Sequence, residues 1–168
     1  MGVKFDVQMT TKAMYNFMLF HTYSTFGGVL GAVFGVIAVI LGVRAALQGD
    51  YTAMATFFFM GVLFLLMTPI TLRSKAKAQV KGTPMFQKPI SYELLEEGVK
   101  VSQDGQEVVN SWKDFSKAVS SGGAIILYIT RVRAIIFTRE AMGEQYATVV
   151  EMISTHMPPS KVKLRQVR

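Results

Sequence analysis

Two long stretches without a charged residue dominate the pattern of hydrophobic and polar positions along the chain. They run over residues 22–43 and 51–72 and consist mostly of apolar and small side chains. At a rise of ~1.5 Å per residue, each stretch forms a helix long enough to cross a hydrocarbon core of about 30 Å. Buried helices of soluble proteins rarely stay uncharged over such a length. The pattern therefore predicts two membrane-spanning helices.

The segment that joins the two spans is short and ends in turn-forming residues. Arg44–Asp50 (RAALQGD) finishes with Gly49 and Asp50, which favour turns, so residues 22–72 are expected to form an antiparallel transmembrane hairpin. Lys and Arg accumulate on the cytoplasmic side of membrane spans. The turn carries only Arg44, whereas the opposite side carries Lys4, Lys12, Arg73, Lys75, Lys77, Lys81 and Lys88. This asymmetry predicts a multi-pass membrane protein with both termini in the cytoplasm.

Residues 1–21 precede the first span and show two patterns. Val3–Met9 alternates apolar and polar side chains with the period of two that a half-buried strand requires. Thr10 or Thr11 can then cap a helix, and the apolar residues that follow predict that this helix lies at the membrane interface or continues into the first span. We do not expect the first span to be a cleaved signal peptide, because its apolar stretch is too long and a second span follows.

Small residues recur inside the first span. Gly27, Gly31 and Gly35 are spaced four residues apart, and small residues at this spacing form a groove into which another helix can pack closely. The second helix of the same hairpin can fill the groove, and so can the same helix of a second copy in a homodimer. The tethered second helix is the nearer partner and is favoured.

Residues 73–89 follow the second span and are rich in basic, small and polar residues. Gly82, Pro84 and Pro89 predict a linker here. Basic side chains beside a span are attracted to anionic lipid at about 1 kcal/mol each. The basic residues of this linker therefore either determine the topology alone or bind an anionic lipid headgroup, and the candidates are Arg73, Lys75, Lys77 and Lys81.

From residue 90 the pattern changes to short strands separated by turns. Strands are predicted over residues 90–96, 99–102, 107–111, 115–120, 124–130 and 134–138. Asp104-Gly105 favours a type I′ hairpin turn, Ser121-Gly122-Gly123 marks another turn, and residues 141–157 carry apolar side chains at helical spacing. Pro158-Pro159 ends this helix, and the basic tail over residues 158–168 is expected to be disordered or to lie on the membrane surface.

Residues 90–157 are expected to form one small domain. Successive antiparallel strands followed by a helix describe a partly closed β-barrel or a bent sheet. Roughly 70 residues make only a marginal core, and the strand predicted at Val3–Met9 would strengthen it by covering a free sheet edge. The expected fold class is an α+β membrane protein, in which a two-helix transmembrane hairpin carries a cytoplasmic antiparallel sheet or barrel closed by a C-terminal helix.

Composition narrows the chemistry. Charged residues make up 17% of the chain and hydrophobic residues 51%, with a formal net charge of +7; ordinary soluble domains contain roughly 25% charged residues. Because the basic residues flank hydrophobic spans, their excess indicates a membrane surface and no nucleic acid. Cys is absent, which excludes thiol catalysis and thiolate metal sites. Without a catalytic motif, a phosphate loop or metal-ligand spacing, we expect no enzyme, no cofactor and no metal site.

Three arginines around one predicted hairpin are a further candidate for binding. Arg131 and Arg133 lie at its tip, and Arg139 follows its second strand. They form either a site for a phosphate or lipid headgroup, or ordinary solvated surface.

Other polar and aromatic residues of the domain have structural interpretations. Trp112 is expected to plug the sheet where a short turn starts, and Asp114 to cap that turn. Glu96 and Glu97 are expected in a solvated turn, and His156 belongs to no metal-binding pattern.

Three segments resemble the YcxB-like family of bacterial membrane proteins: ISYELLEEGVKVS from residue 90, SWKDFSKAV from residue 111, and AIIFTREAM from residue 134. The resemblance covers nearly the whole chain. It implies an N-terminal strand and helix, two closely spaced spans and a cytoplasmic domain of pleckstrin-homology-like type. The family often places Pro just before the basic residue that follows the last strand, where this chain has Phe137-Thr138-Arg139. The resemblance supports fold and topology and implies no known biochemical activity.

Two functions of different classes follow from these patterns. The first is a membrane-anchored binding or scaffold module that meets an inner-leaflet lipid or a protein partner, and the basic segments and the lack of catalytic motifs favour it. The alternative is an accessory subunit of a transporter or a toxin-defence system, which the glycine row favours.

Overall fold

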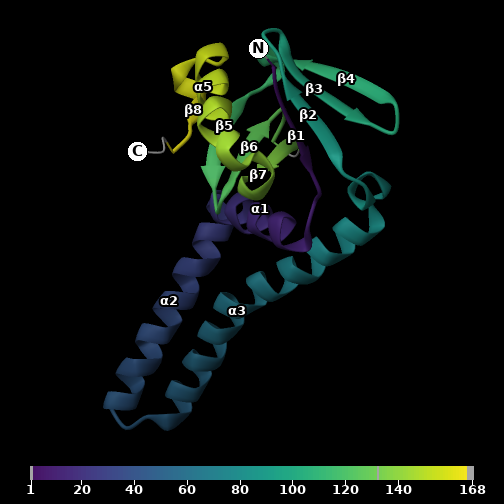
Figure 1. Ribbon diagram of the computed structural model, residues 1–168. Coiled ribbons are helices and arrows are strands. Elements are labelled where there is room, and N and C mark those ends of the chain that lie inside the picture. The colour runs from purple at the N-terminus through teal and green to yellow at the C-terminus, as the bar shows by residue number, and fades with distance from the viewer. Residues whose placement is uncertain (1, 132, 166–168) are drawn as a thin grey trace. The chain divides into compact units, whose positions relative to one another are not determined.

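The computed structural model describes residues 2–131 and 133–165, and the chain divides into two compact units (Figure 1). The hairpin unit is Met18–Ala78, and the sheet unit combines Met1–Phe17 with Gln79–Arg168. One boundary falls within helix α1 (Thr11–Tyr23) and the other within helix α3 (Tyr51–Gly82). Segments from both ends of the chain therefore build the sheet unit.

The hairpin unit contains two long apolar helices, α2 (Phe26–Leu47) and the greater part of α3. Both helices are long and apolar enough to cross a membrane. α3 begins at residue 51, as predicted, but continues past residue 72 to Gly82. The first part of the expected linker is therefore helical, because its Lys, Ala, Gln and Arg residues are good helix formers and Gly82 is the first residue that ends the helix.

A break at Ser24 and Thr25 separates α1 from α2, so that α2 starts and ends later than the predicted 22–43. The Thr25 hydroxyl donates a hydrogen bond to the Thr22 carbonyl oxygen at 2.6 Å. Gly28 is required at this bend, because a Cβ there would lie 2.1 Å from the same carbonyl oxygen. A local polar turn thus replaces the uninterrupted helix that the apolar pattern predicted.

The turn of the hairpin is shorter than predicted. α2 continues beyond Arg44 because Ala and Leu favour helix, and only residues 48–50 connect it to α3. Gly49 has a φ of +78°, which an L side chain rarely adopts. The Asp50 carboxylate accepts a hydrogen bond from the Ala53 N–H at 2.9 Å and caps α3.

Two glycines allow α2 and α3 to approach closely. A Cβ at Gly35 would lie 2.7 Å from Leu65 Cγ, and a Cβ at Gly61 would lie 2.7 Å from Val39 Cγ2 and 3.2 Å from the Gly35 carbonyl oxygen. Neither position has room for a side chain. Gly35 therefore packs against the second helix of the same hairpin, the partner favoured from the sequence.

The rest of the predicted glycine row does not face α3. A Cβ at Gly27 or Gly31 would meet no atom within 4 Å among the described residues. The buried residues of α2 are instead Gly35, Ala38, Gly42 and Ala45. Residues spaced alternately three and four apart stay on one helix face and can all contact an antiparallel neighbour. Residues spaced strictly four apart shift gradually around the helix and leave that face.

Sheet A of the sheet unit is antiparallel and has the strand order β1-β2-β3-β4. Its strands are β1 (Val3–Val7), β2 (Ile90–Leu94), β3 (Gly98–Gln103) and β4 (Gln106–Ser111). β1 pairs with β2 along its full length, which confirms that the N-terminal strand covers an edge of the sheet. Asp104 and Gly105 both have positive φ, of 51° and 79°, as the predicted type I′ turn requires.

Sheet B has the order β7-β6-β5-β8. Its strands are β5 (Lys117–Ser121), β6 (Ala124–Tyr128), β7 (Ala134–Thr138) and β8 (Val162–Lys163). β8 runs parallel to β5, so the domain is not purely antiparallel. The prediction of disorder in the tail is wrong for residues 162–164, because Val162 and Leu164 pack against the core. Residues 166–168 of the tail lie outside the described residues.

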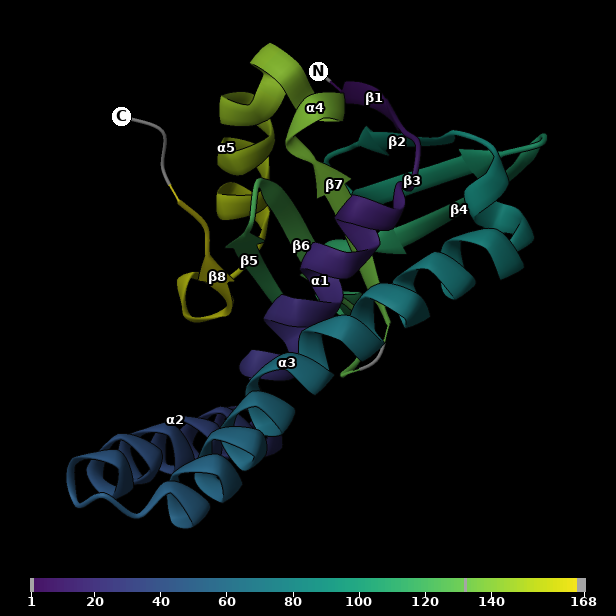
Figure 2. The same cartoon turned by 90° about the horizontal axis from the view of Figure 1, so that it is seen from below.

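Helix α1 starts where the sequence predicted. The Thr10 hydroxyl accepts a hydrogen bond from the Ala13 N–H at 3.1 Å and caps it. The first half of α1 lies across sheet B (Figure 2). Met14 is buried there, and the Phe17 and Tyr128 ring centroids are 6.2 Å apart.

The two sheets do not close into a barrel, because the strands pair as two separate four-stranded sheets. Ile125 and Leu127 face the main core, while Ile126 and Tyr128 alternate with them and are also buried. Side chains of successive strand residues point to opposite faces, so β6 is covered on both sides.

The predicted helix over residues 141–157 is divided. α4 (Arg139–Met142) and a short 3₁₀ turn precede α5 (Tyr146–His156). Gly143 between them has a φ of 50°, a conformation that interrupts an α-helix of L residues. The Thr138 hydroxyl accepts a hydrogen bond from the Ala141 N–H at 3.4 Å and starts α4 earlier than predicted.

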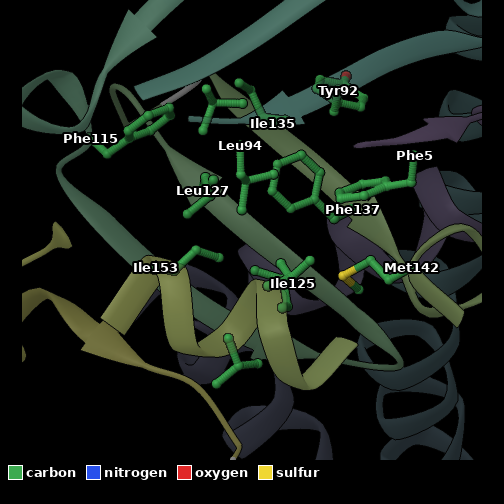
Figure 3. Close-up of a cluster of buried hydrophobic side chains, with 14 of the residues drawn as sticks. Phe5, Tyr92, Leu94, Phe115, Ile125, Leu127, Ile135, Phe137, Met142 and Ile153 are labelled. Carbon is green, nitrogen blue, oxygen red and sulfur yellow. The ribbon is translucent and has the colours of Figure 1, made fainter. Parts of the chain in front are cut away.

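The main core of the sheet unit lies between sheet A, sheet B and α5 (Figure 3). Phe137 of β7 is fully buried and makes edge-on contacts with the rings of Phe5 and Tyr92, at centroid distances of 5.0 and 5.1 Å. Trp112 is buried as predicted, and its indole N–H donates to the Leu95 carbonyl oxygen at 2.9 Å.

Candidate functional site

The sheet unit contains a cavity of about 410 Å³, which we call the apolar cavity. Its lining is mostly apolar and includes three methionines, Met9, Met14 and Met85. Methionine side chains are flexible and adapt to irregular ligands. Pockets for small molecules commonly measure about 300–1,000 Å³ and are lined mainly by apolar residues with a few polar groups. The apolar cavity matches this description.

Strand register explains why one wall of the cavity is apolar. Tyr92 pairs with Val101, and Val101 pairs with Val108, so the three side chains form a row across sheet A. All three line the cavity. Val109, the next residue along β4, is not among the lining residues, because neighbouring strand residues point to opposite faces.

A few polar groups interrupt the apolar lining. They belong to Tyr92, Asn110, Gln79 and Arg133. Burial raises the pKa of Tyr92 to about 12. Its phenol is protonated at physiological pH, as an ordinary tyrosine is, and can donate a hydrogen bond. Arg133 brings the positive charge of the lining. The cavity therefore suits a ligand that is largely apolar and carries one anionic group.

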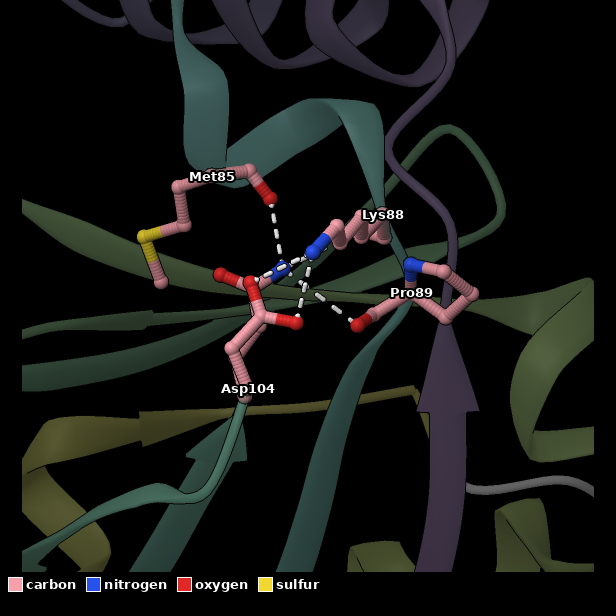
Figure 4. A network of polar contacts seen from close by, with 5 residues as sticks. Met85, Lys88, Pro89 and Asp104 are labelled. Carbon is pink, nitrogen blue, oxygen red and sulfur yellow. Dashed lines mark hydrogen bonds and ion pairs between the residues drawn. The ribbon is translucent and has the colours of Figure 1, made fainter.

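A polar network positions the wall formed by the 3₁₀ helix η1 (Pro84–Gln87) (Figure 4). The Gln103 amide donates to the carbonyl oxygens of Met85 at 2.8 Å, Lys88 at 3.2 Å and Pro89 at 3.3 Å. Lys88 also forms an ion pair with Asp104 at 2.8 Å. Gln103 and Asp104, at the end of the β3–β4 hairpin, thus hold in place the segment in which Met85 lines the cavity.

The structure separates the three arginines that were grouped from the sequence. Arg133 lines the apolar cavity, and its carbonyl oxygen accepts from the Ile129 N–H at 2.9 Å, which closes the β6–β7 turn. Arg131 is exposed beside it. Arg139 lies beyond the far end of β7, and at about 3.3 Å per strand residue the five residues of that strand place it well away from Arg133.

The basic residues of the expected linker lie on α3. Arg73, Lys75, Lys77 and Lys81 are all exposed. Arg73, Lys77 and Lys81 share one face of the helix at a spacing of four residues, whereas Lys75 lies on another face. Arg73, Lys75 and Lys77 belong to the hairpin unit, while Lys81 belongs to the sheet unit with Arg131 and Arg133. They form a charged helix surface and no enclosed site.

His156 joins the end of α5 to the turn after β2. Its ring stacks on Trp112 at a centroid distance of 5.3 Å. One ring nitrogen lies 2.8 Å from the Met152 carbonyl oxygen and the other 2.9 Å from a Glu96 carboxylate oxygen. Both partners are acceptors, so the geometry favours the imidazolium, which donates from both nitrogens. The hydrogen bond to Met152 and then that to Glu96 raise the pKa of His156.

This contact predicts a pH-dependent part of the stability. Because the folded pKa lies above the ordinary value of 6.5, the stabilisation is complete below about pH 6.5 and is lost as pH rises through the folded pKa. Glu96→Gln and His156→Gln should reduce the difference in unfolding midpoint between pH 5.5 and 8.5 by up to a few degrees, because the Glu96 side chain is 81% exposed and solvent screens the pair. Glu97→Gln is the matched control, and an equal effect of this variant would contradict the assignment.

The cavity lining could not be identified from the sequence. Val108 and Val109 are identical neighbours, so the sequence does not show which side chain faces the cavity. The strand register of β4 shows that it is Val108. Asp114 does cap its turn as predicted, accepting from the Ser111 N–H at 3.0 Å. Within residues 2–131 and 133–165, no group of three or more His, Asp or Glu residues converges as a metal site would require.

Residues 94–153 match the family model described as YcxB-like protein, which confirms the resemblance over this segment, whereas the sequence suggested it over nearly the whole chain. The matched segment runs from the last residue of β2 into α5, and so contains most of the two sheets but none of α1, α2 and α3. A search of curated proteins and a search of solved structures each gave no match.

Proposed function

We propose that the chain, whose residues 94–153 match the YcxB-like protein model, is a membrane-anchored module that binds an anionic lipid. The apolar cavity is the observation that carries this proposal. Its apolar lining suits an acyl chain, and Arg133 on its wall suits a phosphate-containing headgroup, because guanidinium groups bind phosphate through charge-assisted hydrogen bonds. The basic face of α3 adds a general attraction to an anionic membrane surface.

The topology is part of the same proposal. We assign α2 and α3 as two membrane spans, which their length and apolar composition support, and the resemblance to the YcxB-like family supports a bacterial cell membrane. The position of Arg44 in the last turn of α2, against the Lys and Arg residues at the other helix ends, supports both termini in the cytoplasm. Two four-stranded sheets with a C-terminal helix support a pleckstrin-homology-like domain at the inner leaflet.

The test compares two neighbouring residues of β4 in the full chain. Both side chains are exposed, Val108 at 60% and Val109 at 48%, but only Val108 lines the apolar cavity. Val108→Phe therefore enlarges a side chain of the cavity lining, whereas Val109→Phe makes the same change on the opposite face of β4. Native mass spectrometry of the detergent-solubilised chain with phosphatidylglycerol should show retention at least ~10-fold weaker for Val108→Phe, because the acyl chain loses its buried surface. Equal retention by the two variants would refute the proposal.

The charge of the headgroup is tested in the same experiment. Arg133→Ala should weaken phosphatidylglycerol retention by roughly 10-fold or more, and Arg131→Ala should weaken it less because Arg131 does not line the cavity. Wild-type retention of phosphatidylcholine should be lower than that of phosphatidylglycerol. The full chain is required because a fragment such as 86–168 would lack β1 and α1, which contribute Phe5, Val7 and Met14 to the interior.

An accessory subunit of a transporter or a toxin-defence system is the second candidate. The open positions Gly27 and Gly31 favour a further helix partner. Lipid also covers such a face in a membrane, so this observation discriminates less than the apolar cavity does, and we place lipid binding first.

A further inference from the structure

A second cavity of the sheet unit, of about 270 Å³, contains two arginines and no acidic residue in its lining. We call it the arginine cavity. Its walls come from the β5–β6 turn, the start of α4, Tyr146 of α5 and the segment after β8, and its charged residues are Arg139 and Arg165. It shares no lining residue with the apolar cavity.

Arg139 is held in a fixed orientation. Its backbone N–H donates to the Gly123 carbonyl oxygen at 2.7 Å, and its guanidinium carbon lies 4.1 Å from the centroid of the Tyr146 ring. Stacking on an aromatic ring uses the face of the guanidinium group and leaves the N–H groups at its edge available. Arg139 therefore has hydrogen-bond donors free for a ligand while its position is already ordered.

Arg165 is fixed through its backbone. Its N–H donates to the Ser120 hydroxyl at 3.1 Å, and its carbonyl oxygen accepts from the Tyr146 hydroxyl at 3.3 Å. The Ser120 and Tyr146 hydroxyls are 3.4 Å apart and complete the network. Tyr146 thus orders both arginines, one through its ring and the other through its hydroxyl.

The charges of this cavity are unbalanced. Neither Arg139 nor Arg165 forms an ion pair with another residue of the described chain. Glu140, next to Arg139, is absent from this cavity's lining, although both residues line a neighbouring cavity. Two guanidinium groups at one cavity repel each other, and an anion bound between them would turn this repulsion into attraction.

We propose that the arginine cavity binds a phosphate group, with Arg139 and Arg165 as its charged ligands and the hydroxyls of Ser120 and Ser121 beside them. Guanidinium groups match the spacing of phosphate oxygens and form paired hydrogen bonds with them. The site is independent of lipid binding in the apolar cavity. Its phosphate comes either from a soluble phosphate compound or from the headgroup of a lipid.

The experiment follows thermal unfolding of the detergent-solubilised full chain by the fluorescence of its single tryptophan, Trp112. Inorganic phosphate, compared with chloride at the same ionic strength, should raise the unfolding midpoint, because a ligand that binds only the folded state stabilises it. A second arm uses nanodiscs of phosphatidylcholine with and without phosphatidic acid. A shift with free phosphate identifies a soluble source, and a shift only with phosphatidic acid identifies a lipid source.

Variants separate a built site from general charge attraction. Arg165→Ala should weaken apparent phosphate affinity by about 10-fold or more and preserve the fold, because only the backbone of Arg165 makes hydrogen bonds in the described structure. Arg139→Lys keeps the charge but loses the paired donors, and should also weaken binding. Lys163→Ala removes an exposed charge of β8 that lines neither cavity and should bind as the wild type does. Equal losses in Lys163→Ala and Arg165→Ala, or no shift in either arm, would overturn the proposal.

Discussion

Deleting residues 2–9 should abolish cooperative folding of the sheet unit. β1 pairs with β2 from Val3 opposite Leu94 to Val7 opposite Ile90, and the deleted segment also buries Phe5, Val7 and Met9 almost completely. Each such side chain contributes roughly 1.5–3 kcal/mol on burial. Their loss together is comparable with the total stability of a small domain, about 5–15 kcal/mol.

Limited proteolysis of the full chain in detergent measures this effect. The deleted chain should be cleaved rapidly within residues 90–157 under conditions that leave the wild type intact. Unchanged protease resistance would show that the sheet unit does not need β1. Two point variants of β1 provide a matched comparison: Phe5→Ala should cost about 3–5 kcal/mol, whereas Lys4→Ala, on the exposed face of the same strand, should cost less than ~1 kcal/mol.

This dependence on β1 was foreseeable because the pattern is strong and local. The alternation in Val3–Met9 fixes which side chains face inward once the segment is a strand. The same holds for the Asp104-Gly105 turn and the uncharged helices α2 and α3, whose character depends on short stretches of sequence. Local patterns therefore predicted elements, their approximate bounds and the cover of one sheet edge.

The features that the sequence did not show depend on distant parts of the chain. β8 pairs with β5 across more than 40 residues, and a two-residue strand has no pattern of its own. Arg165 reaches Arg139 only through this pairing, whereas adjacency in sequence had grouped Arg139 with Arg133. Gly35 and Gly61 meet because the rotation of each helix about its axis brings these two residues to face each other. The glycine spacing on one helix does not determine this rotation.

The separation of the two cavities has a functional consequence. The apolar cavity and the arginine cavity both involve residues of the β6–β7 region, but they lie near opposite ends of β7. A ligand in one therefore does not exclude a ligand in the other by direct overlap. The variants of Arg133 and Arg165 should act independently, each on its own ligand.

Phe137→Ala should produce the largest destabilisation of any single truncation in the main core. Phe137 has 0% exposure, and it contacts Phe5 of β1 and Tyr92 of β2 edge-on, with interplanar angles of 90° and 67°. Phe137 of sheet B thus packs directly against two strands of sheet A. Removal of a buried Phe typically costs about 3–5 kcal/mol, since the cavity left behind is only partly filled. Phe137→Leu retains more of the volume and should cost less.

Denaturant unfolding followed by Trp112 fluorescence measures both variants, with Val109→Ala as an exposed control. The double variant Phe5→Ala with Phe137→Ala should be more stable than the sum of the single losses predicts, by about 0.5–3 kcal/mol, because the contact is already lost in either single variant. Strict additivity would show that the rings do not interact energetically. Because Tyr92 packs against Phe137 and also lines the apolar cavity, Phe137→Ala should in addition weaken phosphatidylglycerol retention, which links the inter-sheet core directly to the proposed lipid site.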